Sequence, residues 1–367
     1  MLGVESRAVM PGTRQEQDDA DLIRTQFSNL ESAEWWKSHE LDGVVLYAWG
    51  SPKFRIVAAA IQQAGIFLVL NQDNGGLVSP LAGVGDWLRE QWILAGQGRG
   101  AMAWLRCGGQ VLRGVSVGLF LTDTRRAAHL KHSNVIACVS PKAAGYYRKV
   151  CWWYGGADLA GRVVLLPHAV ETRFGFSDGT KRRQVACVGR WQDVVQKRPW
   201  LLMETIGLLV AADDGVEVVI AGQVTSELEK WHRSLTDDRR SRVRLLGRVD
   251  REELAGILRE SQVFYSPSAY ESFGIAAAEA LCSGCSVVAG RSVSMASFEW
   301  FVAEHSGTLS ETDDAAGHMW TLERELTCWE QGGRVAREIA GVWGLRLHAD
   351  RVAEQVLQLA VSGTGVS

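Results

Sequence analysis

The sequence predicts an α/β fold with two doubly wound parallel sheets that face each other across a cleft. Its 367 residues exceed the size of roughly 250 residues at which single hydrophobic cores usually stop growing. In both halves of the chain, short apolar runs of strand length alternate with helical segments, as in parallel sheets covered on both faces. The polar, turn-rich stretch Pro167–Arg182 separates the two series and is the expected linker.

The first half is expected to hold four strands separated by helices. The strands are expected at Val44–Ala48, Ile66–Leu70, Val135–Val139 and Val163–Leu166. The helices are expected at Pro52–Ala64, in three stretches between Leu81 and His129, and at Pro141–Val150. Residues 1–40 are polar and show no strong strand, so the N-terminal domain, residues 1–167, has an atypical or missing first strand–loop unit.

The second half repeats this alternation and forms a second domain over residues 168–345. Its strands are expected at Val185–Val188, Val216–Ala221, Val243–Leu246, Val263–Ser266 and Ser286–Ala289, and its helices near 198–211, 225–235, 251–260 and 275–283. In the tail, Ala349–Leu359 is amphipathic, with Val352, Val356 and Leu359 on one helix face. Residues 346–367 are therefore expected to form a closing helix.

Composition excludes several classes of protein. The net charge is −3 and the pI is near 6.3, so no global charge favours nucleic acid or an anionic surface. No apolar run approaches the roughly 18 residues needed to cross a bilayer, and the first residues do not resemble a signal peptide. The seven cysteines are an odd number and suit a reducing compartment. We expect a cytoplasmic protein.

The strongest chemical signal lies between residues 270 and 281, after an expected strand. Glu271 falls in the loop at the carboxyl end of that strand, and Ser272–Ile275 are expected to open a helix, where free N–H groups and the helix dipole attract an anion. Gly274 permits a ligand to approach the backbone closely. Glu279 lies about one turn further on. The alternative is a carboxylate that merely complements the helix dipole, followed by an incidental surface Glu279.

Two further segments strengthen this signal. Gly189 and Arg190 end one strand and Lys197 follows before a helix, so two cations at one sheet edge form a candidate diphosphate clamp. Taken alone, a Gly-Arg turn and a solvated lysine are equally good explanations. The segment Val243–Val249 is a strand followed by a glycine and a helix, with Arg248 and Val249 as candidates for contact with a base.

The block from Tyr270 to Leu281 resembles the Glu-x7-Glu signature of the retaining family-4 glycosyltransferases. These enzymes have the GT-B fold, which consists of two Rossmann-like doubly wound domains facing a cleft. The resemblance implies that Glu271 lies by the donor sugar, and that the amides of Phe273, Gly274 and Ile275 hold the sugar and diphosphate. It also implies that Glu279 hydrogen-bonds the ribose.

The resemblance extends to the two other segments and implies further roles. Arg190 and Lys197 match the family's phosphate-binding cations, and the backbone at Arg248 and Val249 matches the segment that pairs with the nucleobase. The first domain is then the acceptor domain. The family's opening strand and Gly-Gly loop have no counterpart in residues 1–40. Where many members carry a histidine after the strand at Ile66–Leu70, this chain has Asn71-Gln72-Asp73-Asn74, and Asp73 is a candidate to polarise the acceptor.

The expected function is transfer of a hexose from a nucleoside-diphosphate-sugar, a UDP- or GDP-sugar, to an acceptor with retention of anomeric configuration. No cofactor and no metal is expected, since two cations and a helix dipole can neutralise the leaving diphosphate. The acceptor is a glycan, a lipid-linked sugar or a small molecule, with peripheral membrane contact as an option and no nucleic acid partner. The alternatives are a catalytically weak nucleotide-sugar-binding subunit and a phosphorylase or epimerase of the same fold.

Two other features are expected to be structural. Cys282-x-x-Cys285 has no second pair nearby and stands where the family has small residues, so metal binding is disfavoured. The pair Trp152-Trp153 is expected to pack in the protein, with stacking on a sugar as the alternative.

Overall fold

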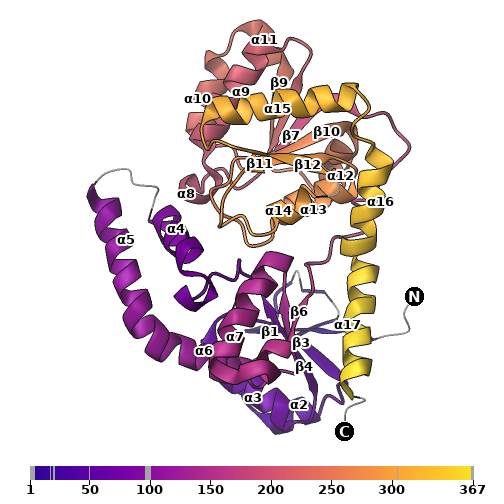
Figure 1. Cartoon of the computed structure of the whole chain (residues 1–367). Coiled ribbons are helices and arrows are strands. Elements are labelled where there is room, and N and C mark those ends of the chain that lie inside the picture. Colours follow the sequence, from indigo (N-terminus) through magenta and orange to yellow (C-terminus); the bar gives the residue numbers. More distant parts are fainter. Residues whose placement is uncertain are drawn as a thin grey trace.

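The computed structural model describes residues 5–364 apart from 17, 20, 49, 96–100 and 304. The chain forms two α/β domains, one above the other in Figure 1, each built on a parallel sheet. This arrangement confirms the predicted fold class.

The N-terminal sheet has four parallel strands in the order β3-β4-β5-β6. They span Gly43–Tyr47, Phe67–Gln72, Val135–Cys138 and Val163–Leu165. One face packs on α3 (Arg55–Gln63) and α7 (Pro141–Gly161) through Leu68, Leu70 and Ile136. The opposite face is covered by the C-terminal helix α17 (Ala349–Thr364). Helices therefore cover both faces, as the apolar strands require.

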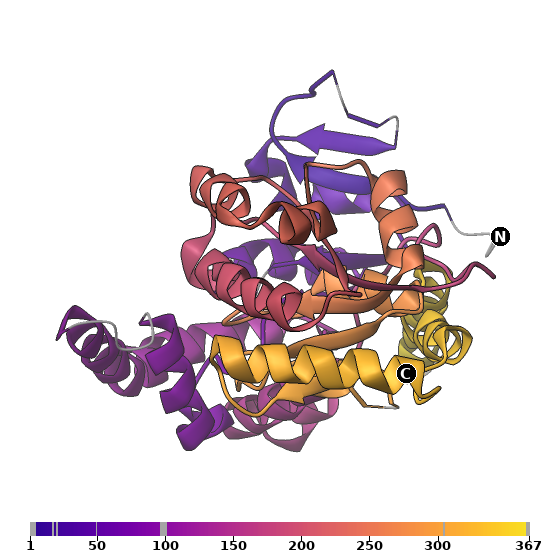
Figure 2. The same cartoon turned by 90° about the horizontal axis from the view of Figure 1, so that it is seen from above.

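The other helices of the N-terminal domain are η1 (Pro52–Phe54), η2 (Pro80–Ala82), α4 (Val84–Leu94), α5 (Ala101–Arg113), the π-helix η3 (Gly114–Thr122) and α6 (Asp123–Leu130). Of these, α5 and η3 form an arm on one side of the molecule (Figure 1). In Figures 1 and 2, α5 projects away from both sheets. Helix α7 runs well beyond its predicted end at Val150, with a kink at Gly156, where φ is 68°.

The prediction of no strong strand in residues 1–40 is wrong. Strands β1 (Ala8–Pro11) and β2 (Leu22–Thr25) pair in parallel as a separate two-stranded sheet. Asp18 and Arg24 form an ion pair of 2.7 Å at this small sheet. Because both strands are short and β1 is largely exposed, neither shows the apolar run that marks a buried strand. Helices α1 (Phe27–Leu30) and α2 (Ala33–Lys37) follow.

The C-terminal sheet has six parallel strands in the order β12-β11-β10-β7-β8-β9. They span Arg182–Val188 (β7), Glu217–Ala221 (β8), Val243–Gly247 (β9), Ser261–Ser266 (β10), Ser286–Gly290 (β11) and Gly307–Ser310 (β12). The chain starts in the middle, builds outward on one side, and then returns to the other side of β7. Ligands of such sheets bind at this reversal, here between β7 and β10.

The helices of the second domain cover both faces of this sheet. They are α8 (Val194–Lys197), α9 (Pro199–Ala212), α10 (Ser226–Ser234), α11 (Asp237–Arg242), α12 (Arg251–Glu260), α13 (Ile275–Cys282), α14 (Phe298–Phe301), α15 (Ala315–Glu330) and α16 (Ala336–Leu347). In Figure 1, α16 and α17 run down one side of the molecule from the second domain to the first. As predicted, Val352, Val356 and Leu359 of α17 share one apolar face, which packs on the N-terminal sheet.

The expected linker is anchored along its length, since Val170 pairs with His348 and Phe174 is fully buried. The tryptophan pair at 152–153 departs from the prediction of packing. Trp152 and Trp153 are 59% and 61% exposed.

Candidate functional site

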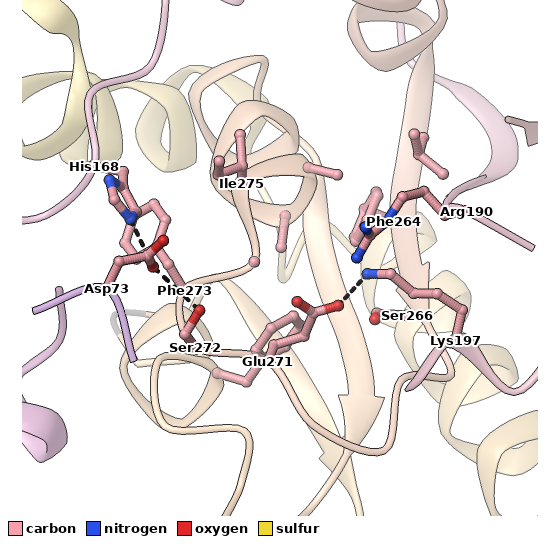
Figure 3. A pocket seen from close by; sticks show the side chains of 15 residues that line it. Asp73, His168, Arg190, Lys197, Phe264, Ser266, Glu271, Ser272, Phe273 and Ile275 are labelled. Carbon is pink, nitrogen blue, oxygen red and sulfur yellow. Dashed lines mark hydrogen bonds and ion pairs between the residues drawn. The ribbon is translucent and has the colours of Figure 1, made fainter. Parts of the chain in front are cut away.

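A cavity of about 270 Å³ lies between the two domains, at the carboxyl ends of β7 and β10. Most of the residues predicted to carry chemistry line it: Asp73, Arg190, Lys197, Glu271, Ser272, Phe273, Gly274 and Ile275. In Figure 3, Arg190 and Lys197 approach from one side, Asp73 and His168 from the other, and Glu271 lies between them. The cavity therefore occupies the reversal point of the C-terminal sheet and is closed on its other side by the N-terminal domain.

Helix α13 points its N-terminus at this cavity and begins at the first residue of the predicted range 275–283. It starts at Ile275, and Gly274 adopts a left-handed conformation with φ 83°. Ser272 and Phe273 therefore precede the helix rather than opening it. A side chain at position 274 would have its Cβ 2.7 Å from the Phe298 ring, so glycine is required there. The first N–H groups of α13 have no partner within the helix and carry its positive dipole end, which suits an anion.

Phe273 lines the cavity, and its ring is packed in the protein. Its side chain is 1% exposed and packs edge-on against Phe301 and His168. The buried ring fixes the segment that leads from Glu271 into α13. This fixed segment sets the distance between the carboxylate and the helix N-terminus.

Glu271 is held by a dense set of donors. Its Oε1 accepts hydrogen bonds from the Lys197 ammonium and from Ser268 Oγ, the latter at 2.9 Å, and its Oε2 accepts from Gln196 Nε2 at 3.3 Å. The Glu271 and Lys197 side chains are only 12% and 16% exposed. Without a ligand, Glu271 therefore neutralises Lys197, and an incoming anion competes with Glu271 for that cation.

Arg190 is less constrained than Lys197. It follows β7, its side chain is 69% exposed, and its Nη2 donates to Gln196 Oε1 at 3.2 Å. Gly189 lies just outside the cavity, where the turns after β7 and β8 touch. A Cβ at Gly222, whose φ is 119°, would lie 1.9 Å from the Gly189 carbonyl oxygen. The contact between these turns fixes the backbone from which Arg190 projects.

Asp73 contacts Ser272 of the other domain and a histidine that the sequence did not single out. His168 Nε2 donates to Asp73 Oδ1 at 2.9 Å, and Ser272 Oγ donates to the same oxygen at 3.2 Å. The His168 ring lies between Tyr47, stacked at 6.2 Å, and Phe273, edge-on at 5.3 Å. The hydrogen bond from His168 lowers the pKa of Asp73, so its carboxyl is anionic at neutral pH. The available signal was a histidine at the carboxyl end of β6.

Glu279 is buried, so the alternative of a surface carboxylate is wrong. It is 2% exposed and lies 2.8 Å from Nη1 of Arg251, which also pairs with Glu171. Burial raises the pKa of Glu279 and the Arg251 guanidinium opposes that rise. A buried carboxylate needs such a partner.

The candidates for base contact lie at the end of β9, three residues before Arg251. Arg248 is exposed and its Nη2 donates to Gln223 Oε1 at 3.2 Å, and Val249 is half-buried. None of Gly189, Arg248, Val249 and Glu279 is among the residues that line the cavity. The predicted positions therefore divide into one group around the cavity and another beyond it along the sheet edge.

Arg198, next to Lys197, braces the loop that carries Glu271. It is a non-glycine residue with φ 45° and is 2% exposed. Its Nε donates to the Pro267 carbonyl at 2.6 Å, its Nη2 to the Ser268 carbonyl at 3.2 Å, and its Nη1 to Asp313 at 2.7 Å. The sequence analysis missed this residue. These bonds fix the loop on which Ser268 and Glu271 stand.

Part of the chain is similar to a known protein family and to two named relatives. Residues 182–324 match the family described as Glycosyl transferases group 1. The chain is 31% identical over 163 residues to the GDP-mannose:cellobiosyl-diphosphopolyprenol alpha-mannosyltransferase of Komagataeibacter xylinus, and the aligned region covers 40% of this chain and 39% of that protein. It is 30% identical over 242 residues to the phosphatidyl-myo-inositol mannosyltransferase of Mycolicibacterium smegmatis, and that alignment covers 60% of each protein.

The likeness of fold extends over nearly the whole chain. The structure of sucrose-phosphate synthase from Thermosynechococcus elongatus superimposes with a TM-score of 0.60 at 16% identity, covering 98% of this chain and 89% of that one. Residues 182–324 thus match the Glycosyl transferases group 1 family, and the chain as a whole has the two-domain GT-B fold. These findings agree with the predicted resemblance to retaining family 4.

Proposed function

We propose that the protein transfers a hexose from a nucleoside-diphosphate-sugar to an acceptor, with retention of anomeric configuration. One observation carries the proposal: the helix N-terminus of α13, two cations and Glu271 surround one cavity that Asp73 of the other domain also lines. A sugar bound there would meet the phosphate-binding groups on one side and the acceptor domain on the other. Retention rests on the resemblance to family 4.

The donor would lie along the edge of the C-terminal sheet. We place its diphosphate against the N-terminus of α13 and Arg190, its ribose near Glu279, and its base at the backbone of Arg248 and Val249. The ion pair of the buried Glu279 with Arg251, which is partly exposed, supports this order, because a carboxylate held next to the base segment can accept hydrogen bonds from ribose hydroxyls.

The chemistry would depend on redistribution of charge around Glu271. An incoming diphosphate would draw Lys197 away from Glu271, and the freed carboxylate would support positive charge on the sugar or hold one of its hydroxyls. Lys197, Arg190 and the α13 dipole would stabilise the departing nucleoside diphosphate. Asp73, anionic and oriented by His168, would hold the acceptor hydroxyl, whose proton leaves late, to the departing phosphate.

The named relatives suggest where to begin the search for substrates. Both are mannosyltransferases by name, one with a GDP-mannose donor, and both names contain a lipid acceptor. We therefore propose a GDP- or UDP-hexose as donor, with GDP-mannose tested first, and a lipid-linked acceptor. We also propose that the protein acts in the cytoplasm, because its seven cysteines are free and suit a reducing compartment.

Thermal denaturation with GDP, UDP, ADP and TDP tests the donor site. A ligand at one hundred times its Kd stabilises the native state by about 2.7 kcal/mol, which raises Tm measurably. We expect a rise with GDP or UDP, and release of diphosphate from the matching nucleotide-sugar. If none of the four raises Tm, the donor site is wrong. Tight binding without hydrolysis or transfer would favour the alternative of a binding subunit.

A further inference from the structure

The arm of the N-terminal domain exposes an unusual number of large apolar side chains. Over α5 and η3 these are Met102, Trp104, Leu105, Leu112, Val115, Val117, Phe120 and Leu121. Leu105 is 70% exposed and Phe120 is 81% exposed. A contiguous apolar surface of this kind on a folded domain marks a site of interaction.

The arm is a well-anchored element. Val111 packs on the cluster that contains Trp87, and the Tyr154 hydroxyl donates to the Leu119 carbonyl at 2.8 Å. The Trp104 ring lies 4.3 Å from the ring of Trp92 on α4. The apolar side chains are therefore presented on a supported helix.

The helix sorts its side chains into three faces. Ala103 and Val111 face the protein. Leu105 and Leu112, seven residues apart, share an exposed apolar stripe. Each is followed by an arginine, Arg106 and Arg113, so the arginines line one edge of that stripe. An apolar stripe with tryptophan and an arginine edge is typical of helices that lie in a membrane interface.

The charge of the arm indicates which kind of surface it would bind. Between Ala101 and Thr122 the only charged side chains are Arg106 and Arg113, and the sequence has no Asp or Glu from Gln91 to Thr122. The whole chain is slightly acidic, with a net charge of −3, so this positive segment is a local feature. An apolar stripe edged only by cations complements anionic lipid head groups above acyl chains.

We propose that the arm formed by α5 and η3 docks on the surface of an anionic lipid bilayer, with the stripe of Leu105 and Leu112 in the interface. Along the described chain there is no helix long and apolar enough to span a membrane, so the proposed attachment is peripheral. Helix α4 contacts both this arm, through Trp92 and Trp104, and the C-terminal domain, through Glu90 and Ser294. The consequence that docking brings the cleft to a lipid-linked acceptor rests on the proposed function, whereas docking itself does not.

Vesicle co-sedimentation of the full chain tests the proposal. We expect binding to vesicles of phosphatidylcholine with phosphatidylglycerol, weaker binding to phosphatidylcholine alone, and weakening by salt. The double variant Leu105→Glu/Leu112→Glu should reduce binding roughly tenfold or more, because it places charge in the apolar stripe. Arg106→Gln/Arg113→Gln should weaken binding only to the anionic vesicles.

A matched control uses two equally exposed apolar residues of the other domain. Trp320 and Leu345 are 66% and 65% exposed, so Trp320→Glu/Leu345→Glu makes the same change away from the arm and should leave vesicle binding unchanged. The Tm of each variant, with and without GDP and UDP, reports folding and the donor site separately. The proposal is overturned if the wild type does not bind anionic vesicles, or if the arm variant binds them as well as the wild type does. A concentration-dependent dimer that only the arm variant abolishes, without vesicle binding, assigns the arm to a second copy of the chain instead.

Discussion

The two domains of this protein have similar parallel sheets but differ in strand order and in what they contribute to the cavity. The C-terminal sheet starts at its centre with β7 and reverses toward β10, and the candidate donor site sits at that reversal. In the N-terminal sheet, β3 to β6 follow one another in chain order. Its contribution to the cavity is the loop after β4, which carries Asp73, while its long helices form the exposed arm.

The difference shows which parts of a site are fixed by a sheet and which by contacts between domains. Arg190 and Glu271 follow two adjacent strands of one sheet, so strand pairing brings them together. Asp73 reaches the same cavity from the other domain, where Ser272 of the C-terminal domain and His168, which follows β6, both donate to its carboxylate. Changes in the first group should alter donor binding and bond cleavage, whereas changes in the second should alter acceptor use.

The largest effect is expected at Glu271. Glu271→Gln keeps the shape of the side chain but removes the charge proposed to support the reacting sugar. We expect turnover to fall about 10²- to 10³-fold. Binding of the nucleoside diphosphate should be kept or improved, because Lys197 loses its anionic partner. Steady-state rates, together with the Tm shift given by the diphosphate, measure the two effects. A rate within about threefold of the wild type would remove Glu271 from the mechanism.

A smaller loss is expected at Asp73. Asp73→Asn should lower turnover roughly tenfold to hundredfold, because the acceptor hydroxyl loses its anionic partner. The Tm shift given by nucleoside diphosphates should not change, because the donor groups belong to the other domain. Loss of diphosphate binding in Asp73→Asn would contradict the division between the two groups.

His168→Phe is the matched variant for Asp73, because it keeps the ring between Tyr47 and Phe273 and removes the N–H that lowers the pKa of Asp73. The pKa of Asp73 should then rise toward its ordinary value. Since the anion is the working form, activity on the acid side should be lost at a higher pH than in the wild type. The pH profile of kcat measures this shift, and an unchanged acid limb would show that His168 does not act through Asp73.

The sequence was most informative where the local backbone pattern is distinctive. The segment from Glu271 to Glu279 combines a strand end, a required glycine and a helix N-terminus within a few residues, and its resemblance to the family signature indicated a role for each carboxylate. The expectation that Ser272 and Phe273 open this helix is wrong, because the left-handed Gly274 delays its start to Ile275.

Features that depend on distant contacts were not predictable in this way. His168 acquires a role only through Asp73, which is 95 residues away along the chain, and Arg198 only through the Pro267–Ser268 carbonyls. Strands β1 and β12 are short, and neither consists of an apolar run that marks a strand. The exposed apolar arm lacks a periodic signal that separates it from a buried helix, because exposure is a property of the fold.

A modest loss of diphosphate affinity is expected from Arg190→Ala. The guanidinium is largely exposed in the free protein, so its removal should leave stability unchanged and weaken diphosphate binding roughly tenfold. Arg233 offers a matched control, because its side chain is also 69% exposed and lies in α10. Arg233→Ala should bind like the wild type in isothermal titration. Equal affinities for the two variants would show that Arg190 does not face the diphosphate.

The smallest effect is expected where the two domains meet, at Glu90 of α4. Burial raises the pKa of Glu90 from 4.5 to about 7, and the neighbouring Ser294 of the C-terminal domain opposes this rise. Because the folded-state pKa is the higher one, the protonated form favours folding. Its contribution is complete below about pH 4.5 and is lost as the pH rises through about 7. Glu90→Gln keeps a neutral side chain, so between about pH 5.5 and about pH 8.5 its Tm should fall about 2–4 °C less than that of the wild type. Calorimetry at these pH values measures the Tm of both proteins. All other groups titrate in both, so an equal fall in Tm would mean that the protonation of Glu90 does not contribute to stability.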